Sequence, residues 1–211
     1  MVERLDGELA NWKAHIRKLE EEEGLINLAW DQLGDSLIEN RMAEAEEQAE
    51  QTCGEETCGE EAGLEAAERA VRSWMQQDDT CPIEGEGEGP AEAEPKQTET
   101  LRQACAERRE LALSKLAGPS WHGTVLIAAG RRHIWLRLPK GLGSTALLRA
   151  ALLEGAAFLP GPLAFAEPTA GSERLIRLSY TGCGIAQLAE GLDRVAAALG
   201  AFTARLDQGR S

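Results

Sequence analysis

The sequence predicts a small α/β (α+β) sandwich that follows an acidic helical segment and a flexible linker. The chain has 211 residues and a net charge of -14, and its charges are divided unequally. Residues 1–100 contain 28 acidic against 8 basic side chains, whereas residues 101–211 contain 8 against 14. A run rich in Gly, Pro and Glu separates the two compositions, and helical and strand patterns alternate only after it. We expect an acidic helical segment at 1–76, a linker at 77–98 and an α/β domain at 99–207.

Apolar residues recur at helical spacing near the N-terminus and predict a first helix. A second amphipathic stretch from Leu25 to Leu37 predicts another helix, so that the two form a helical hairpin or a short coiled coil. The stripes either pack within the chain or bind a partner or a second copy, and the sequence leaves both readings open. The first stripe consists of Val2, Leu5, Leu9, Trp12, Ile16 and Leu19.

The rest of the acidic half has little apolar content. Residues 44–61 are mostly Glu, Gln, Ala, Thr and Gly, which is typical of a solvated helix end or a disordered run, and a short helix is predicted at 64–75. Cys53 and Cys58 lie in a tandem repeat, but zinc usually takes four ligands in tighter pairs. We therefore expect free thiols and no metal site.

Helices and strands alternate over short distances in the second half. Gly118 and Pro119 stop the first helix, and Ser144 is expected to cap a later one. We expect the helices to cover one face of the sheet. The predicted helices are 99–116, 145–154 and 185–206, and the predicted strands are 133–139, 156–159 and 175–180.

Composition also excludes several classes of partner. An acidic first half argues against binding to nucleic acid or to anionic membranes, because both need clustered Lys and Arg. No stretch approaches the roughly 18 apolar residues of a spanning helix, and no signal peptide is visible. We expect a cytoplasmic protein with a possible protein partner.

Four motifs in the second half occur in a known order. They lie at 133–142, 147–161, 175–180 and 189–192. Together they resemble the C-terminal small domain of class I/II, fold-type I aminotransferases, which depend on pyridoxal phosphate. The resemblance is closest to 2-aminoadipate-type aminotransferases and to MocR-type (GntR family) regulators. The N-terminal half carries no such resemblance.

The resemblance implies a role for one residue and a cofactor. Arg177, in the Arg-Leu-Ser-Tyr strand, matches the arginine that binds the α-carboxylate of the amino-acid or 2-oxo-acid substrate in that family. A planar guanidinium suits this task because it pairs with both carboxylate oxygens. Pyridoxal phosphate is implied by the family alone.

The catalytic part of that family is missing from the pattern. Cofactor chemistry needs a lysine in a Ser-x-x-Lys setting and a phosphate-binding turn, and the chain shows neither. We assign no catalytic, cofactor-binding or metal residue, and we expect the isolated chain to hold no pyridoxal phosphate. The lysines of the chain are Lys13, Lys18, Lys96, Lys115 and Lys140.

Two functions remain open on these grounds. In the first, the chain is a partial aminotransferase-like protein, truncated or rearranged, that is inactive alone or works only beside a chain supplying the large domain. In the second, it is a noncatalytic interaction or regulatory protein whose N-terminal helices bind a protein partner. A separate possibility is that residues 1–95 come from a misjoined reading frame.

Overall fold

A computed structural model of the chain describes residues 2–29, 60–80, 95–130, 132–165 and 169–208. Most of the predicted acidic run, together with Cys53 and Cys58, lies outside these residues. The same holds for most of the predicted linker, although its first and last residues are helical.

The core of the molecule is one five-stranded sheet with the order β1-β4-β5-β3-β2. Strand β1 runs parallel to β4, and the other neighbours are antiparallel. The mixed α/β class expected from the sequence is therefore confirmed. The strands are β1 (Ile26–Leu28), β2 (Val125–Ala129), β3 (His133–Arg137), β4 (Ala156–Pro160) and β5 (Leu175–Ser179).

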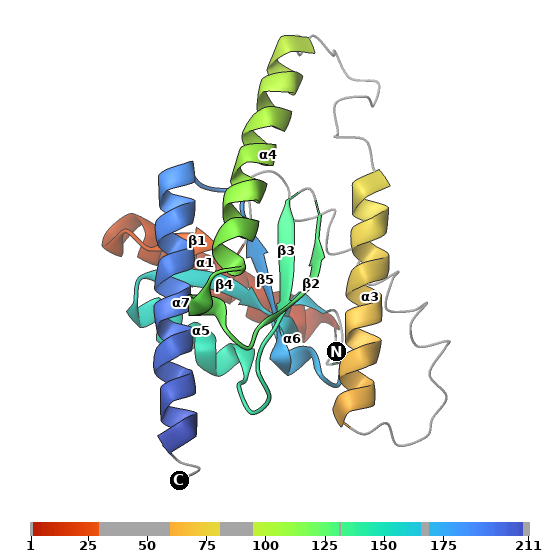
Figure 1. Cartoon of the computed structure of the whole chain (residues 1–211), viewed down its shortest axis with the longest axis vertical. Coiled ribbons are helices and arrows are strands. Elements are labelled where there is room, and N and C mark those ends of the chain that lie inside the picture. Colours follow the sequence, from red (N-terminus) through yellow and green to blue (C-terminus); the bar gives the residue numbers. More distant parts are fainter. Residues whose placement is uncertain (1, 30–59, 81–94, 131, 166–168, 209–211) are drawn as a thin grey trace.

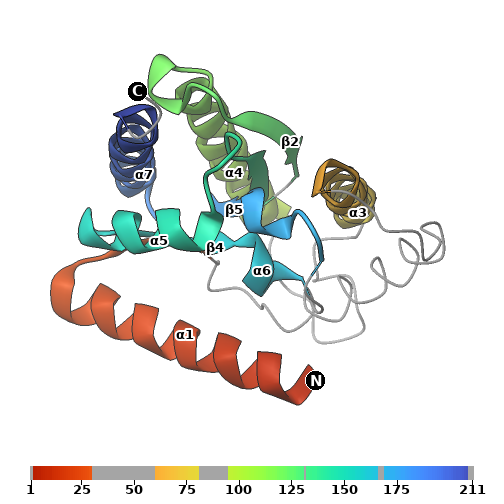
Figure 2. The ribbon, with the colours of Figure 1, turned by 90° about the horizontal axis from the view of Figure 1, so that it is seen from below.

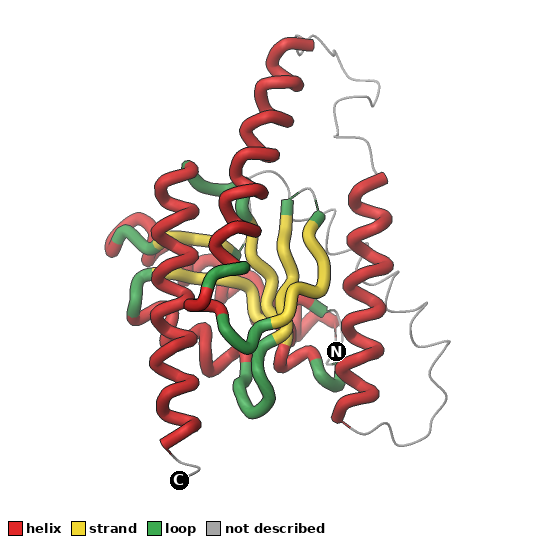
Figure 3. Tube along the Cα trace, viewed as in Figure 1, coloured by secondary structure: helices red, strands yellow, loops and turns green. Residues whose placement is uncertain are grey.

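Helices surround this sheet, and Figure 1 shows α4 and α7 in front of it with α3 beside β2. The tube in Figure 3 shows how the strands are enclosed by long helices. Five helices agree with the helical periods of the sequence: α1 (Val2–Glu23), α3 (Glu60–Thr80), α4 (Pro95–Leu116), α5 (Ser144–Leu153) and α7 (Ile185–Gln208). The shorter elements are α6 (Gly161–Ala164), η1 (Pro119–Trp121) and η2 (Ser172–Arg174).

The predicted second helix is wrong at its start, because residues 25–28 lead into and form a strand. Gly24, with φ of +65°, ends α1, and the backbone N–H of Ile26 then donates to the carbonyl of Gly155 (2.9 Å). Ile26 and Leu28 become buried between β4 and α7. Long-range pairing of two apolar residues overrides the local helical pattern here.

Helices cover both faces of the sheet, whereas the sequence analysis placed them on one. Residues 26 and 28 approach Gly191, so α7 covers their face. Trp74 of α3 packs against His133 and Trp135, whose side chains lie on the opposite face because they alternate with Ile134. Figure 2 also shows α1 on the side of the sheet away from α4 and α7.

The structure also differs from the sequence analysis at two local features. Strand β2 was not predicted, because Val-Leu-Ile-Ala-Ala does not alternate and the edge strand carries a register shift at Leu126. Gly143, not Ser144, is the N-cap of α5. Ser144 is the first helical residue, and its buried hydroxyl has no hydrogen-bond partner among the described residues.

None of the helices that the structure describes is long and apolar enough to cross a membrane.

Candidate functional site around Arg177

Arg177 lies at the centre of the sheet. In strand β5 it pairs with Trp135 of β3 on one side and with Leu159 of β4 on the other. Residues directly opposite each other in antiparallel strands point to the same face, so Arg177 shares a face with Trp135. Only 4% of its surface is exposed. The middle strand of the sheet therefore carries a buried positive charge.

The N-terminal segment contacts this cation directly. Nη2 of Arg177 donates a hydrogen bond to the carbonyl oxygen of Ala29 (3.2 Å), the residue that follows β1. The turn at Ala29 is itself held, because Oδ1 of Asn27 accepts a hydrogen bond from the Ala29 N–H (2.9 Å). Asn27 also donates to Glu20 of α1 (3.3 Å). The position of the guanidinium thus depends on residues of the first half.

His133 is the second polar group on this face. It lies two residues before Trp135 and is fully buried. Burial lowers the pKa of His133 well below its ordinary value of 6.5, and the positive charges of Arg177 and Arg132 lower it further. The ring is therefore neutral at pH 7. Its two nitrogens and Nε1 of Trp135 have no hydrogen-bond partner within the described residues.

Helix α3 closes the face over these rings. Trp74 lies 6.2 Å from the His133 ring and 6.4 Å from the Trp135 ring, the latter edge-on. Phe165, directly after α6, also packs edge-on against Trp135 (5.9 Å). The aromatic contacts bring apolar surface to the site but give no partner to the buried nitrogens. A buried hydrogen-bonding atom without a partner costs about 1–3 kcal/mol.

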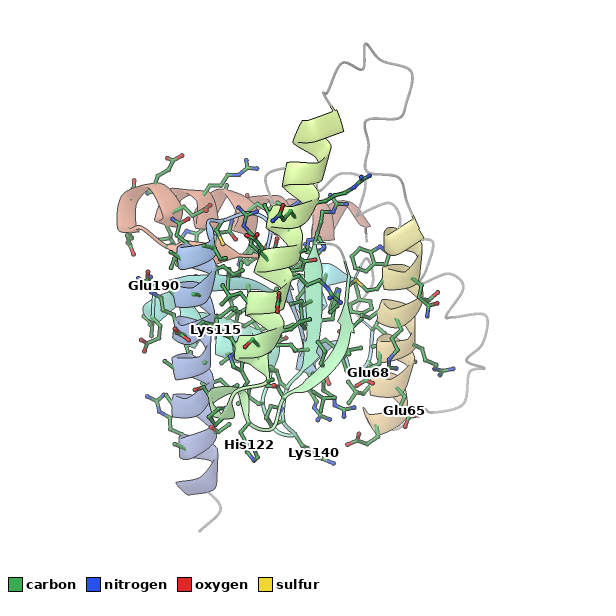
Figure 4. The ribbon with its side chains drawn as sticks, turned by 45° about the horizontal axis from the view of Figure 1, so that its top comes forward. Glu65, Glu68, Lys115, His122, Lys140 and Glu190 are labelled. Atoms are coloured by element: carbon green, nitrogen blue, oxygen red, sulfur yellow. The ribbon has the colours of Figure 1, made fainter. Side chains whose placement is uncertain are left out.

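A buried carboxylate fixes α3 to the sheet. Glu68 accepts hydrogen bonds from Arg137 of β3 (2.6 Å) and from Arg72 one helical turn later (3.0 Å). Glu68 is almost fully buried, whereas Glu65 on the same helix is exposed, and both are labelled in Figure 4. The ion pair between Glu68 and Arg137 therefore ties α3, which lies beside β2, to strand β3.

Arg174 and Pro160 have structural roles near the site. Arg174 donates to the carbonyl of Leu138 (3.2 Å) and lies 3.7 Å from Glu61, so it ties η2 to the chain after β3. Pro160 ends β4, and Gly161 then begins α6 in contact with the Ser172 carbonyl, where a side chain has no room.

Three of the lysines pair with carboxylates at separate places on the molecule. Lys115 pairs with Asp193 of α7 (2.6 Å), Lys140 with Glu61 (3.3 Å) and Lys18 with Glu22 (3.8 Å). Figure 4 shows Lys115 next to α7 and Lys140 at a separate end of the molecule. These residues do not fit pyridoxal phosphate, which needs one lysine held among oriented partners. Nor does any group of His, Cys, Asp and Glu within the described ranges suit a metal ion.

Comparison with known proteins gives a partial match. The 2-aminoadipate transaminase of Thermus thermophilus is 43% identical to this chain over 70 residues. The match covers 33% of this chain and 17% of that enzyme. This chain resembles part of an aminotransferase. The resemblance to 2-aminoadipate-type aminotransferases drawn from the sequence is thereby confirmed. No protein-family model matches the chain.

Solved structures of aminotransferases match about half of the chain. The α-aminoadipate aminotransferase of Thermus thermophilus, solved with N-(5'-phosphopyridoxyl)-L-leucine, is 32% identical, with a TM-score of 0.47. The matched region covers 52% of this chain and 28% of the Thermus thermophilus enzyme. The kynurenine aminotransferase of Pyrococcus horikoshii is 26% identical, with a TM-score of 0.44, over 50% of this chain and 26% of its own.

The sequence analysis names Arg177 as a candidate but none of the residues around it. Ala29, Glu68 and Trp74 come from the first half, which carries no recognised motif. The one signal for them was the alternation of His133, Trp135 and Arg137, which places a histidine, an indole and a cation on one strand face. A polar strand face of this kind indicates that another element must cover it.

Proposed function

We propose that the chain is an aminotransferase-like protein that keeps a carboxylate-binding arginine, Arg177, and does not catalyse amino transfer by itself. The position of Arg177 carries the proposal: a buried guanidinium in the middle of the sheet, in the strand whose motif resembles the substrate-binding strand of aminotransferases. Its ligand class is an amino acid or 2-oxo acid, whose carboxylate matches the fork of the guanidinium.

The lysines support the noncatalytic part of the proposal. Lys18, Lys115 and Lys140 each form an ion pair with a carboxylate, and Lys13, half-buried on α1, has a partner of its own. A charge-assisted contact at Arg177 contributes about 1.5–3 kcal/mol, less than the roughly 4 kcal/mol of millimolar binding. Recognition of a carboxylate by this chain alone is therefore weak.

The test uses the purified full-length chain. We expect no stoichiometric retention of pyridoxal phosphate after dialysis, followed by absorbance, and no amino transfer from a panel of amino acids to 2-oxoglutarate. Retention of one cofactor per chain that disappears in Lys115→Ala or Lys140→Ala would refute the noncatalytic assignment.

The carboxylate role of Arg177 is tested separately by NMR titration with 2-oxoglutarate. We expect weak shifts of β5 amides that Arg177→Lys abolishes, because lysine keeps the charge but loses the planar fork. Arg149→Lys, an exposed position on α5, serves as the matched control. Equal shifts in both variants would contradict the role of Arg177.

The packing of α1 gives no reason to propose a second function. Ile16 is fully buried within this chain, and Trp12 and Leu19 pack against the same core. Self-contained packing thus accounts for the described part of the N-terminal stripe. A coiled coil, a protein partner, a likeness to MocR-type regulators and a cytoplasmic location remain predictions.

A further inference from the structure

We propose that the start of α5 is a binding site for a phosphate group. The site consists of the segment 140–146 (Lys-Gly-Leu-Gly-Ser-Thr-Ala), which leads from β3 into α5, and of Arg174 in η2. It lies beyond the end where β3 finishes and β5 begins, whereas Arg177 lies in the middle of β5. This site is therefore separate from the proposed carboxylate site and does not depend on it.

The first turn of α5 has backbone donors without acceptors. Its N-cap, Gly143, has no side chain that accepts a hydrogen bond, and the N–H of Leu147 donates to the Gly143 carbonyl (3.0 Å). The N–H groups of residues 144–146 precede this bond and have no acceptor among the described residues. Thr145 and Ala146 are exposed, and a Cβ built on Gly143 would meet nothing within 4 Å. An anion from solution can therefore reach these donors.

Buried polar side chains at this end of the sheet also lack partners. Arg174 is 8% exposed, and its Nη2 donates to the Leu138 carbonyl (3.2 Å). Its Nε and Nη1 have no hydrogen-bond partner within the part of the chain that the structure describes, and neither has the hydroxyl of Ser144, the first helical residue. Native interiors rarely leave such atoms unsatisfied, so they indicate a polar ligand beside the first turn of α5.

The fold brings two cations to this place. The carbonyl of Arg174 accepts from the N–H of Leu138 (2.8 Å), directly after β3, and η2 also contacts α5. Nη1 of Arg174 and Nζ of Lys140 both face Oε1 of Glu61, at 3.7 and 3.3 Å. The distance of 3.7 Å is too long for a hydrogen bond, and the Glu61 side chain is 63% exposed. One exposed carboxylate thus holds two cations weakly, and an anion with more charge can take its place.

The set of donors favours phosphate over a carboxylate. Three backbone N–H groups, a hydroxyl, a guanidinium and an ammonium exceed what the two oxygens of one carboxylate can accept. A phosphate group offers more oxygens and carries about -1.5 to -2 charge at pH 7. Binding of phosphate to free N–H groups at a helix N-terminus that follows a glycine-containing turn is a recurrent arrangement in proteins. The spacing of Gly141 and Gly143 alone does not predict it, because the free donors and Arg174 are evident only in the fold.

The experiment is an NMR titration of the full chain with inorganic phosphate at constant pH, with sodium chloride of equal ionic strength as the reference. We expect saturable shifts of the amides of residues 144–146. Lys140→Gln should weaken binding at least about fivefold, whereas Arg149→Gln, which removes an exposed positive charge further along α5, should change it less than about twofold. Glu61→Gln should strengthen binding at least about threefold, because it removes the competing carboxylate.

Gly143→Asp distinguishes phosphate binding from a defect in folding. An aspartate at the N-cap places its own carboxylate on the free donors, so the phosphate shifts should be lost while Tm stays at or above that of the parent chain. Shifts that persist in Gly143→Asp, or that sodium chloride reproduces, would overturn the inference. Arg177→Lys should leave phosphate binding unchanged, and loss of binding in that variant would place the phosphate at Arg177 and overturn the inference as well.

Discussion

Charged and apolar side chains meet around Arg177, because the guanidinium is buried on the same face of the sheet as His133 and Trp135. Arg177 gains a backbone carbonyl from Ala29, whereas His133 beside it must stay neutral. Neutrality follows from burial first and from the adjacent cations second. The histidine therefore makes the stability of the fold depend on pH.

The sign of this dependence follows from the lowered pKa of His133. The unfolded chain binds the proton near pH 6.5, whereas the folded chain binds it only at lower pH. Stability is therefore full above pH 6.5 and falls as the pH is lowered below it, by on the order of 1 kcal/mol within one pH unit. Urea unfolding between neutral pH and about pH 5 measures this loss.

Matched variants isolate the histidine. His133→Phe keeps an aromatic ring but cannot be protonated, so the loss of stability between pH 6.5 and 5 should become smaller. His122→Gln replaces an exposed histidine and should leave the slope as in the parent chain. A slope that His133→Phe leaves unchanged would show that other groups cause the acid sensitivity.

Strand β1 and helix α7 meet at a position where only glycine fits. A Cβ built on Gly191 would lie 2.7 Å from Cγ2 of Ile26 and 3.2 Å from Cδ1 of Leu28. The close approach lets the helix bury the three-residue strand against β4. The contact between β1 and α7 thus depends on Gly191 having no side-chain methyl group.

Alanine substitutions at two glycines of α7 should have opposite effects. Gly191→Ala is expected to destabilise the chain by about 1–3 kcal/mol, because α7 or β1 must shift. Gly200→Ala has open space around the new methyl and should stabilise it by about 0.5–1 kcal/mol through helix propensity. Thermal unfolding followed by circular dichroism measures both, and destabilisation of equal size would contradict the packing at Gly191.

Helices were predicted more completely than strands, for a physical reason. Apolar residues of α1 and α7 repeat many times at helical spacing, so the local sequence is enough to predict each helix. Strand β1 has three residues and no period, and its pairing with β4 depends on a distant part of the chain. Similarly, the motif around Arg177 predicted that arginine, whereas Ala29 and Trp74 reach it through tertiary packing that no local pattern contains.

At the scale of the whole molecule, the two compositions of the chain meet across α3. Acidic residues of the first half pair with basic residues of the second: Glu68 with Arg137, and Glu61 with Lys140 and Arg174. The exposed pair of Glu61 with Lys140 contributes little to stability. The buried pair of Glu68 instead selects how α3 lies on the sheet.

The first half should also be required for the stability of the second. Leu28→Asp places a charge at a fully buried position of β1 and should destabilise the chain by more than about 3 kcal/mol. Hydrogen exchange should show lost protection in β4 and β5, not in β1 alone. Leu153→Asp, at a position 89% exposed, is the control. Protection of β4 and β5 at parent levels would mean that the sheet is complete without β1.

The contact between Ala29 and Arg177 joins residues 148 positions apart, and this separation has a consequence for biosynthesis. On the ribosome, β1 emerges long before β4, which is its only paired neighbour among the described strands. Topology of such high contact order slows folding, because a large loop must close before the parallel pair forms. The nascent chain therefore carries an unpaired apolar strand until residues 156–160 have emerged, and we expect chaperones to engage it there.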